Sequence, residues 1–155
     1  MVIHLLGQVF IKYQVDCPFD AVKSIIENNV LGKDFDAIFI DFHAEATSEK
    51  MALAKFLDGK VSAVIGTHTH IPTNDCHVMK FGTAYQTDAG MCGDYDSVIG
   101  MDQDIPIKSF VYKRKFGKMK PAQGSGTLCG TIVEINNNCL AKSIFPIKIG
   151  GIIGD

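Results

Sequence analysis

The chain has 155 residues, the size of one ordinary domain, and is long enough to bury a hydrophobic core. Its formal net charge is −2, which gives no indication of a protein built to bind nucleic acid. Hydrophobic residues make up 46% of the chain, but no apolar run approaches the ~20 residues that a transmembrane helix needs.

The cysteines and the opening residues bear on the cellular compartment. The five cysteines are scattered and form no CxxC pair, which argues against a disulfide framework and against a structural zinc site. The opening residues MVIHLLGQVF are apolar but lack the basic segment of a secretion signal. We therefore expect a cytoplasmic protein with reduced cysteines and no membrane contact.

The first part of the chain alternates between strand and helix patterns. In chain order, the sequence predicts a strand over residues 2–10, a helix over 19–31, a strand over 35–42, a helix over 47–58 and a strand over 61–65. A strand, a helix and a strand within about thirty residues form a βαβ unit, whose two strands are parallel. The sequence therefore predicts an α/β fold.

Apolar residues at helical spacing define the inward face of each predicted helix. In the first helix these residues are Val22, Ile25, Ile26 and Val30. In the second helix they are Leu53, Phe56 and Leu57. Gly32 is expected to cap the end of the first helix, and Thr47 or Ser48 the start of the second, with Glu49 in its first turn.

Beyond residue 70 the predicted elements are shorter and richer in strands. The pattern predicts short strands over 77–80 and 83–86, a Gly/Asp-rich loop over 88–101, a helix over 107–112, a polar linker over 117–126, and a hairpin with strands over 127–135 and 140–149. The basic residues between 113 and 120 are interpreted as a solvated face. Residues 150–155 are expected to form a loose tail.

Histidines follow two of the predicted strands. His43 closes the strand over 35–42, and the stretch GTHTH places His68 and His70 just after the strand over 61–65. Ligand sites of parallel α/β sheets lie past the carboxyl ends of the strands, and neighbouring strand ends are about 5 Å apart. In an extended segment His70 would point the same way as His68. Because imidazole is a common ligand of zinc, iron and similar metals, the three histidines are candidate ligands.

Each histidine also has a structural interpretation. A single histidine at a strand end is more often a hydrogen-bonded structural residue than a ligand, and we interpret His4 and His77 in that way. Three histidines at the ends of parallel strands favour a metal site instead. The residues placed to hydrogen-bond to these ligands, or to face a substrate, are Asp41, Glu45, Thr69 and Asp75.

Four segments resemble a known family. They are IDFHAEATSEK (residues 40–50), GTHTHIPTND (66–75), GTAYQTDAGMCGDYDSVIGMD (82–102) and the closing hairpin. Together, at this spacing, they resemble the YmdB-type bacterial metallophosphoesterases of the calcineurin-like superfamily. The resemblance runs from residue 2 to residue 149.

The resemblance implies a four-layer αββα sandwich, to which this chain would contribute a parallel βαβ unit followed by a β-rich half. It also implies a phosphodiesterase with cyclic nucleotides among its substrates and two metals per complete site, with iron or manganese expected and zinc as the alternative. Carried over by motif, His43 and His68 bind one metal and His70 binds the other. A water activated by the two metals would attack the phosphodiester in line.

The sequence lacks several motifs of that family. A strand with a metal-binding aspartate, a Glu-Asn pair and a Gly-Asn-His segment that holds the catalytic histidine are absent from it. We therefore expect residues 1–149 to be the C-terminal part of a metallophosphoesterase domain whose N-terminal half is missing, with no catalytic residue in this chain. Such a piece would hold the histidine part of the site alone and would expose an apolar sheet edge or face.

Three interpretations stay open on the sequence alone. The first is a two-metal phosphodiesterase whose N-terminal half is missing or is a separate chain. The second is a non-catalytic remnant that binds a partner or forms homo-oligomers through its exposed sheet. The third is a simple module that binds one metal.

Overall fold

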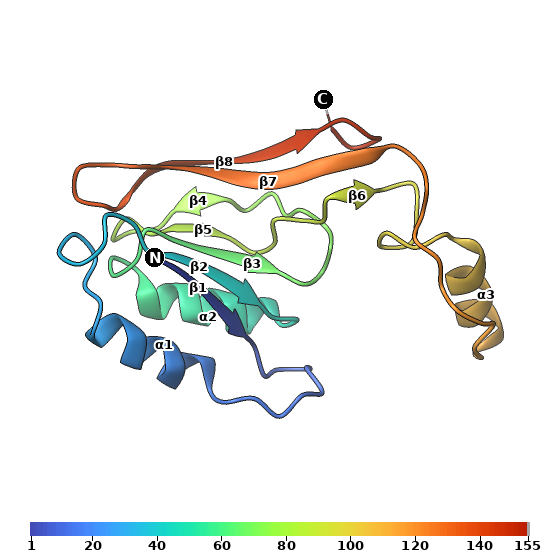
Figure 1. The fold of residues 1–155 in the computed structure, drawn as a ribbon, viewed down its shortest axis with the longest axis horizontal. Coiled ribbons are helices and arrows are strands. Elements are labelled where there is room, and N and C mark those ends of the chain that lie inside the picture. The colour runs from blue at the N-terminus through green and yellow to red at the C-terminus, as the bar shows by residue number, and fades with distance from the viewer. Residues whose placement is uncertain (155) are drawn as a thin grey trace. The chain divides into compact units, whose positions relative to one another are not determined.

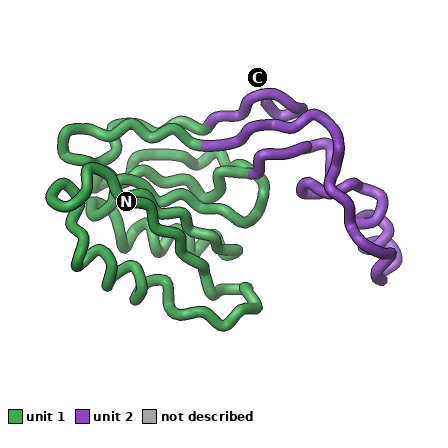
Figure 2. Tube along the Cα trace, in the orientation of Figure 1, with its two compact units in different colours: residues 1–90, 131–146 green, residues 91–130, 147–155 purple. Residues whose placement is uncertain are grey.

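The computed structural model of this protein describes residues 1–154 and divides into two compact units. Unit 1 consists of residues 1–90 and 131–146, and the described part of unit 2 consists of residues 91–130 and 147–154 (Figure 2). The α/β fold expected from the sequence is confirmed, because unit 1 is built on a largely parallel sheet with two helices.

The sheet of unit 1 has five strands. In spatial order they are β1 (Val2–Leu6), β2 (Phe39–His43), β3 (Ala63–Thr67), β5 (Ala84–Gln86) and β4 (His77–Val78). β1, β2, β3 and β5 are parallel, and β4 pairs antiparallel with β5. The predicted βαβ unit is therefore confirmed, and the carboxyl ends of β1, β2 and β3 lie at one edge of the sheet.

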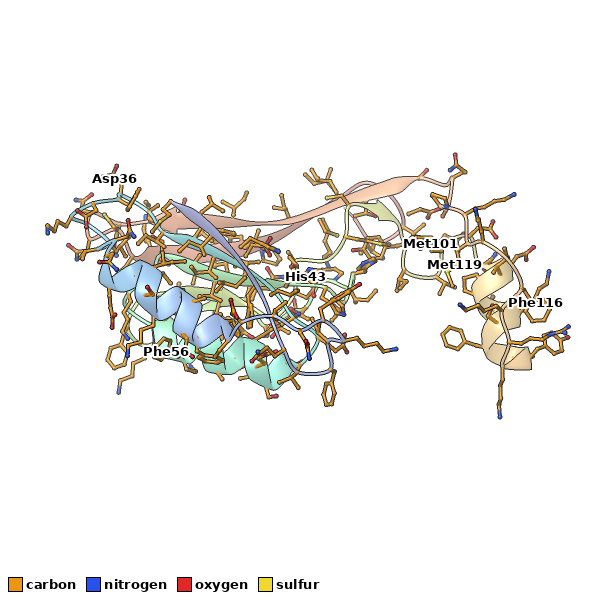
Figure 3. All side chains as sticks on the ribbon, turned by 60° about the horizontal axis from the view of Figure 1, so that its bottom comes forward. Asp36, His43, Phe56, Met101, Phe116 and Met119 are labelled. Carbon is orange, nitrogen blue, oxygen red and sulfur yellow. The ribbon has the colours of Figure 1, made fainter. Side chains whose placement is uncertain are left out.

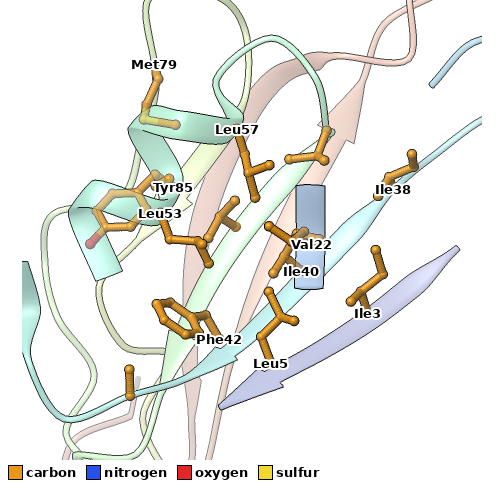
Figure 4. Packing of buried hydrophobic residues seen from close by; sticks show 14 residues of the cluster. Ile3, Leu5, Val22, Ile38, Ile40, Phe42, Leu53, Leu57, Met79 and Tyr85 are labelled. Atoms are coloured by element: carbon orange, nitrogen blue, oxygen red, sulfur yellow. The ribbon is translucent and has the colours of Figure 1, made fainter. Parts of the chain in front are cut away.

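Two helices cover one face of this sheet, α1 (Pro18–Glu27) and α2 (Thr47–Leu57) (Figure 1). The core between them and the sheet includes Val22 of α1, Leu53 and Leu57 of α2, and Phe42 of β2, each fully buried (Figure 4). Burying side chains of this size contributes about 1.5–3 kcal/mol each, so this layer supplies much of the stability of unit 1.

The other face of the sheet packs on part of a hairpin. The hairpin consists of β7 (Gly126–Ile135) and β8 (Ala141–Ile149). The bounds of both strands lie within one residue of those predicted from the sequence. Within unit 1, Ala141 and Ile144 of β8 pack with Ala63, Ile65 and Ala84 of the sheet. Val64, between Ala63 and Ile65 in β3, points to the opposite face of the sheet and belongs to the core that α1 and α2 cover. Successive side chains of a strand alternate between the two faces in this way.

The predicted end of the first helix is wrong. α1 ends at Glu27 with Asn28 as its cap, and Gly32 lies in a later turn with a φ of 78°. The side-chain amides of Asn28 and Asn29 donate to the carbonyls of Ser24 and Ile25, at 2.8 Å each. These bonds satisfy carbonyls of the last turn, so the helix needs no glycine cap.

The predicted cap and inward face of the second helix are also corrected. α2 begins at Thr47, but its N-cap is Ala46 and no side chain caps it. Phe56 is 36% exposed, whereas the buried stripe runs through Lys50, Leu53, Ala54 and Leu57. This spacing of i, i+3, i+4 and i+7 is one helix face, and Phe56 lies beside it, where it contacts Phe19 edge-on.

The predicted start of the first strand is confirmed, and the other bounds of the first three strands are corrected by one to four residues. β1 stops at Leu6, and the chain turns at residues 9–10. An added Cβ at Gly7 would lie 2.5 Å from Ala44 Cβ, so the chain passes close to the end of β2 there. β2 and β3 each begin and end later than predicted. The later ends bring His43 into β2 and Thr67 into β3.

Unit 2 contains the short strand β6 (Gly93–Asp94), which pairs antiparallel with β7, and the helix α3 (Asp104–Tyr112). The predicted helix over 107–112 lies within α3, which ends at Lys113 in the left-handed conformation with a φ of 53°. Within residues 150–154, the amide of Gly154 donates to the carbonyl of Gly150, while residue 155 of the predicted tail lies outside the described residues. None of the helices in residues 1–154 has both the length and the apolar character to cross a membrane.

Candidate metal centre

The ends of β2 and β3 bring two of the predicted ligands together. His43 is the last residue of β2 and pairs in register with Thr67, which directly precedes His68. Nδ1 of His68 lies 3.0 Å from Nε2 of His43, and the two rings are nearly perpendicular at 87°. The expectation that these strand ends are neighbours is therefore confirmed.

A chain of hydrogen bonds fixes the orientation of the His43 ring, which lies at the end of its strand (Figure 3). The hydroxyl of Thr67 donates to Asp41 Oδ1 at 2.9 Å, and the same hydroxyl oxygen lies 3.1 Å from Nδ1 of His43. Because the single hydroxyl proton is used on Asp41, His43 must donate from Nδ1. Nε2 of His43 therefore presents its lone pair toward His68.

The geometry of this pair fits a bound cation. Two nitrogens that each lie 2.0–2.1 Å from one metal are about 2.8–3.4 Å apart for angles between 90° and tetrahedral. The observed separation of 3.0 Å falls in that range, which overlaps that of a hydrogen bond between the two rings. A metal-binding histidine typically donates a hydrogen bond from its other ring nitrogen, which fixes the orientation of the ring. For His43 the acceptor is the hydroxyl of Thr67, which itself donates to Asp41.

The protonation of His43 also favours metal binding. Burial, with smaller contributions from the neighbouring His68 and His4, lowers the pKa of His43 below its usual value of 6.5. The ring is therefore neutral near pH 7, which is the form that binds metals.

Close packing shapes the end of β3, and a buried ion pair shapes the loop that follows it. An added Cβ at Gly66 would lie 1.8 Å from the carbonyl oxygen of Thr87, so only glycine fits there. The amide of Thr69 donates to Asp88 Oδ2 at 2.9 Å, and Lys50 Nζ lies 3.1 Å from the same oxygen. Both side chains of the ion pair are 1% exposed.

Sequence reasoning missed this ion pair. A signal for Lys50 is available, since it falls on the apolar stripe of α2, where a lysine needs a buried partner. The sequence pattern places Asp88 in a Gly/Asp-rich loop, whereas the structure buries it. Nothing in the sequence indicates that these two residues, 38 positions apart, meet.

His70 occupies a different backbone setting from the one expected. The segment after β3 is bent rather than extended, with φ values of 119° at His68 and 69° at His70. The premise that both rings point the same way along an extended chain is therefore wrong. Among residues 1–154, no three His, Cys, Asp or Glu side chains are grouped closely enough to hold a metal by themselves.

The other predicted residues divide between this site and its surroundings. Oε2 of Glu45 lies 2.9 Å from Nε2 of His68, and Oδ2 of Asp41 accepts from Nδ1 of His4 at 2.9 Å. The carboxylate of Asp75 accepts instead from the amide and hydroxyl of Thr87. Burial raises the pKa of Asp75, but hydrogen bonds from Thr73 and Thr87 outweigh it, and the net pKa lies below the usual value of 3.8.

Comparison with known proteins gives concordant matches. A family model described as "YmdB-like protein" matches residues 1–147. The chain is 44% identical over 136 residues to a 2′,3′-cyclic-nucleotide 2′-phosphodiesterase of Bacillus subtilis (strain 168), a match that covers 88% of this chain and 50% of that protein.

Two solved structures share the fold. A hypothetical protein from Thermus thermophilus superposes with a TM-score of 0.88 at 36% identity, covering 97% of this chain and 57% of that one. A protein described as a novel phosphatase from Mycoplasma pneumoniae superposes with a TM-score of 0.85 at 34% identity, covering 96% of this chain and 53% of that one. The chain thus spans about half the length of the proteins that it matches.

Proposed function

Since the chain belongs to the YmdB-like family and has the α/β fold of metallophosphoesterases, we propose that it carries the histidine part of a metal-dependent phosphodiesterase. The proposed substrates are phosphodiesters such as cyclic nucleotides, in keeping with the name of the Bacillus subtilis relative. The observation that carries the proposal is the pair of facing imidazole nitrogens of His43 and His68, 3.0 Å apart at two parallel strand ends.

The proposed roles follow from these contacts. His43 and His68 hold one divalent cation, and His70 contributes to a second. Thr67 and Asp41 keep the proton of His43 on Nδ1, so that Nε2 stays available. Glu45, at 2.9 Å from His68, orients that ring. Imidazole nitrogen suits iron and manganese, which we favour, and also zinc.

A bound divalent cation supplies polarisation of the phosphoryl oxygens and lowers the pKa of a water molecule. The remaining ligands and the group that protonates the leaving oxygen are proposed to come from sequence outside these 155 residues, on a longer chain or a separate one. This is consistent with the chain spanning 50% of its Bacillus subtilis relative.

Elemental analysis of the purified chain tests the proposal. After loading with manganese or iron and desalting, we expect bound metal in the chain and a metal content about tenfold lower in His68→Ala, because one of the two facing nitrogens is removed. His77→Ala is the matched control, since Nδ1 of His77 donates to the carbonyl of Asp75. Unchanged metal content in His68→Ala would overturn the assignment.

An activity assay with bis-p-nitrophenyl phosphate then tests the division of the site. We expect no turnover by the metal-loaded chain alone. Turnover with two metals per chain would mean that these residues suffice, and that no further segment is needed.

A second candidate is a non-catalytic module that binds a partner or a second copy of itself. The open edge of β1 favours it: in the described residues no strand pairs with its outer side, and Val2 is 75% exposed. Light scattering after size exclusion tests it. A stable oligomer without metal binding would support this candidate over the first, and a monomer that binds metal would exclude a second copy as its partner.

A further inference from the structure

We propose that the loop after β1, together with Glu45 and His68, forms a binding site for the nucleoside part of a nucleotide. The site is a cavity of about 490 Å³ in unit 1, lined by Phe10, Ile11, Lys12, Tyr13, Glu45 and His68. This volume lies within the range of small-molecule sites, about 300–1,000 Å³. The proposal rests on the proposed function, because His68 is both a wall of this cavity and a proposed ligand.

The aromatic walls of the cavity are exposed although they are large and apolar. Phe10 is 84% exposed and Tyr13 is 75% exposed. Neither side chain belongs to the core clusters of unit 1, so packing within that unit does not account for them. Exposed aromatic faces on a loop are typical stacking platforms for nucleobases, since every base has a π-face.

The loop is held in place at its start. Both carboxylate oxygens of the buried Glu49 accept from backbone amides, from Gln8 at 2.8 Å and Val9 at 3.2 Å. The side chain of Gln8 also donates to the carbonyl of Val15 at 2.8 Å. These bonds hold residues on either side of Phe10, which has a left-handed φ of 64°. A phenylalanine in that conformation is strained, and such strain gathers at ligand sites.

The same loop is tied directly to the candidate metal centre. The amide of Gly7 donates to the carbonyl of His43 at 2.9 Å, so the loop begins where the histidine strand ends. Phe10 and Tyr13 line the same cavity as His68. A nucleotide bound with its base on the aromatic side chains would reach His68 with its ribose and phosphate.

The charges of the cavity agree with this orientation. Lys12 provides a cation for the phosphate, and Glu45 provides a carboxylate for a ribose hydroxyl. The walls thus combine an apolar end, a cation and an acceptor. A nucleoside phosphate combines the matching groups, whereas a simple aryl phosphate lacks the ribose hydroxyls.

Equilibrium binding of adenosine 3′-monophosphate to the full chain tests the proposal. Saturation-transfer NMR and calorimetry, both with chelator present, report base contact and affinity without dependence on turnover. We expect a loss of affinity of about tenfold in Phe10→Ala and in Tyr13→Ala, because each removes a stacking face. We expect a smaller loss in Lys12→Ala. The controls are Phe110→Ala, an equally exposed aromatic of unit 2, and Lys33→Ala.

The outcomes separate this proposal from the proposed function. Loss of nucleotide affinity in the aromatic variants with no metal bound by the wild-type chain would support the nucleoside site and count against the metal site. Metal binding that needs His68, with nucleotide affinity unchanged in Phe10→Ala and Tyr13→Ala, would overturn the nucleoside site alone. Equal losses in Phe110→Ala and Phe10→Ala would also overturn it, because binding would then be unspecific.

Discussion

The two units of the molecule differ in how their helices place apolar residues. Unit 1 buries them in two clusters on the two faces of its sheet, including Phe42, Leu53 and Ile65. In unit 2 the helix α3 exposes Phe110 by 79%, Val111 by 65% and Tyr112 by 64%. Every histidine of the chain lies in unit 1. The candidate metal-binding histidines therefore lie in the unit whose own core holds them in place.

The two units also differ in how far their ion pairs are exposed. Unit 1 pairs Lys50 with Asp88 at 1% exposure, and both are held by packing. In unit 2 the pair of Lys108 and Asp104 is 54% and 76% exposed, at 3.8 Å. The basic residues between 113 and 120 are all exposed, as the solvated basic face expected from the sequence requires. Buried pairs are sensitive to the loss of one partner, whereas exposed pairs contribute little.

The largest effect is expected when the buried ion pair of Lys50 and Asp88 is broken. Lys50→Met leaves the carboxylate of Asp88 buried without its cation, and we expect a loss of about 3–5 kcal/mol in the free energy of unfolding. Lys108→Met in unit 2 is the matched control, with an expected change below about 0.5 kcal/mol. Urea denaturation followed by circular dichroism measures both. Similar losses in the two variants would contradict the contrast between the units.

The next effect concerns the apolar residues. Leu53→Ala removes a fully buried side chain of unit 1, and we expect a loss of about 2–5 kcal/mol. Phe110→Ala in unit 2 removes a side chain that is already exposed, so we expect a change of about 0.5 kcal/mol or less. The same urea titration compares them. A large loss in Phe110→Ala would mean that α3 packs in solution against something, such as a second copy.

The smallest effect is a dependence of stability on pH. The pKa of His43 is lowered in the folded chain from its usual value of 6.5, so the unfolded chain binds that proton first as the pH falls. The free energy of unfolding should therefore be highest above pH 6.5 and decline below it. We expect a shallower decline in His43→Gln, measured with chelator present. An identical decline in His43→Gln would show that other groups cause it.

Much of the fold could be predicted from local patterns. The parallel βαβ unit follows from apolar runs separated by a helical pattern, and the closing hairpin from β-branched runs around the Asn136–Asn138 turn. The meeting of His43 and His68 also follows, because both come at the carboxyl ends of neighbouring parallel strands. These features depend on residues close together in sequence, so periodicity is enough to find them.

The tertiary structure alone decided how the site is supported. Lys50 meets Asp88, and Glu49 reaches the amides of Gln8 and Val9, across 38 to 41 positions of sequence. Gly66 must be glycine because the carbonyl of Thr87 lies against it. Local propensity carries no information on such pairs, because they exist only once the helices and strands have packed. The sequence by itself determined which residues stand at the strand ends, and packing determined the buried charges and close contacts that hold them there.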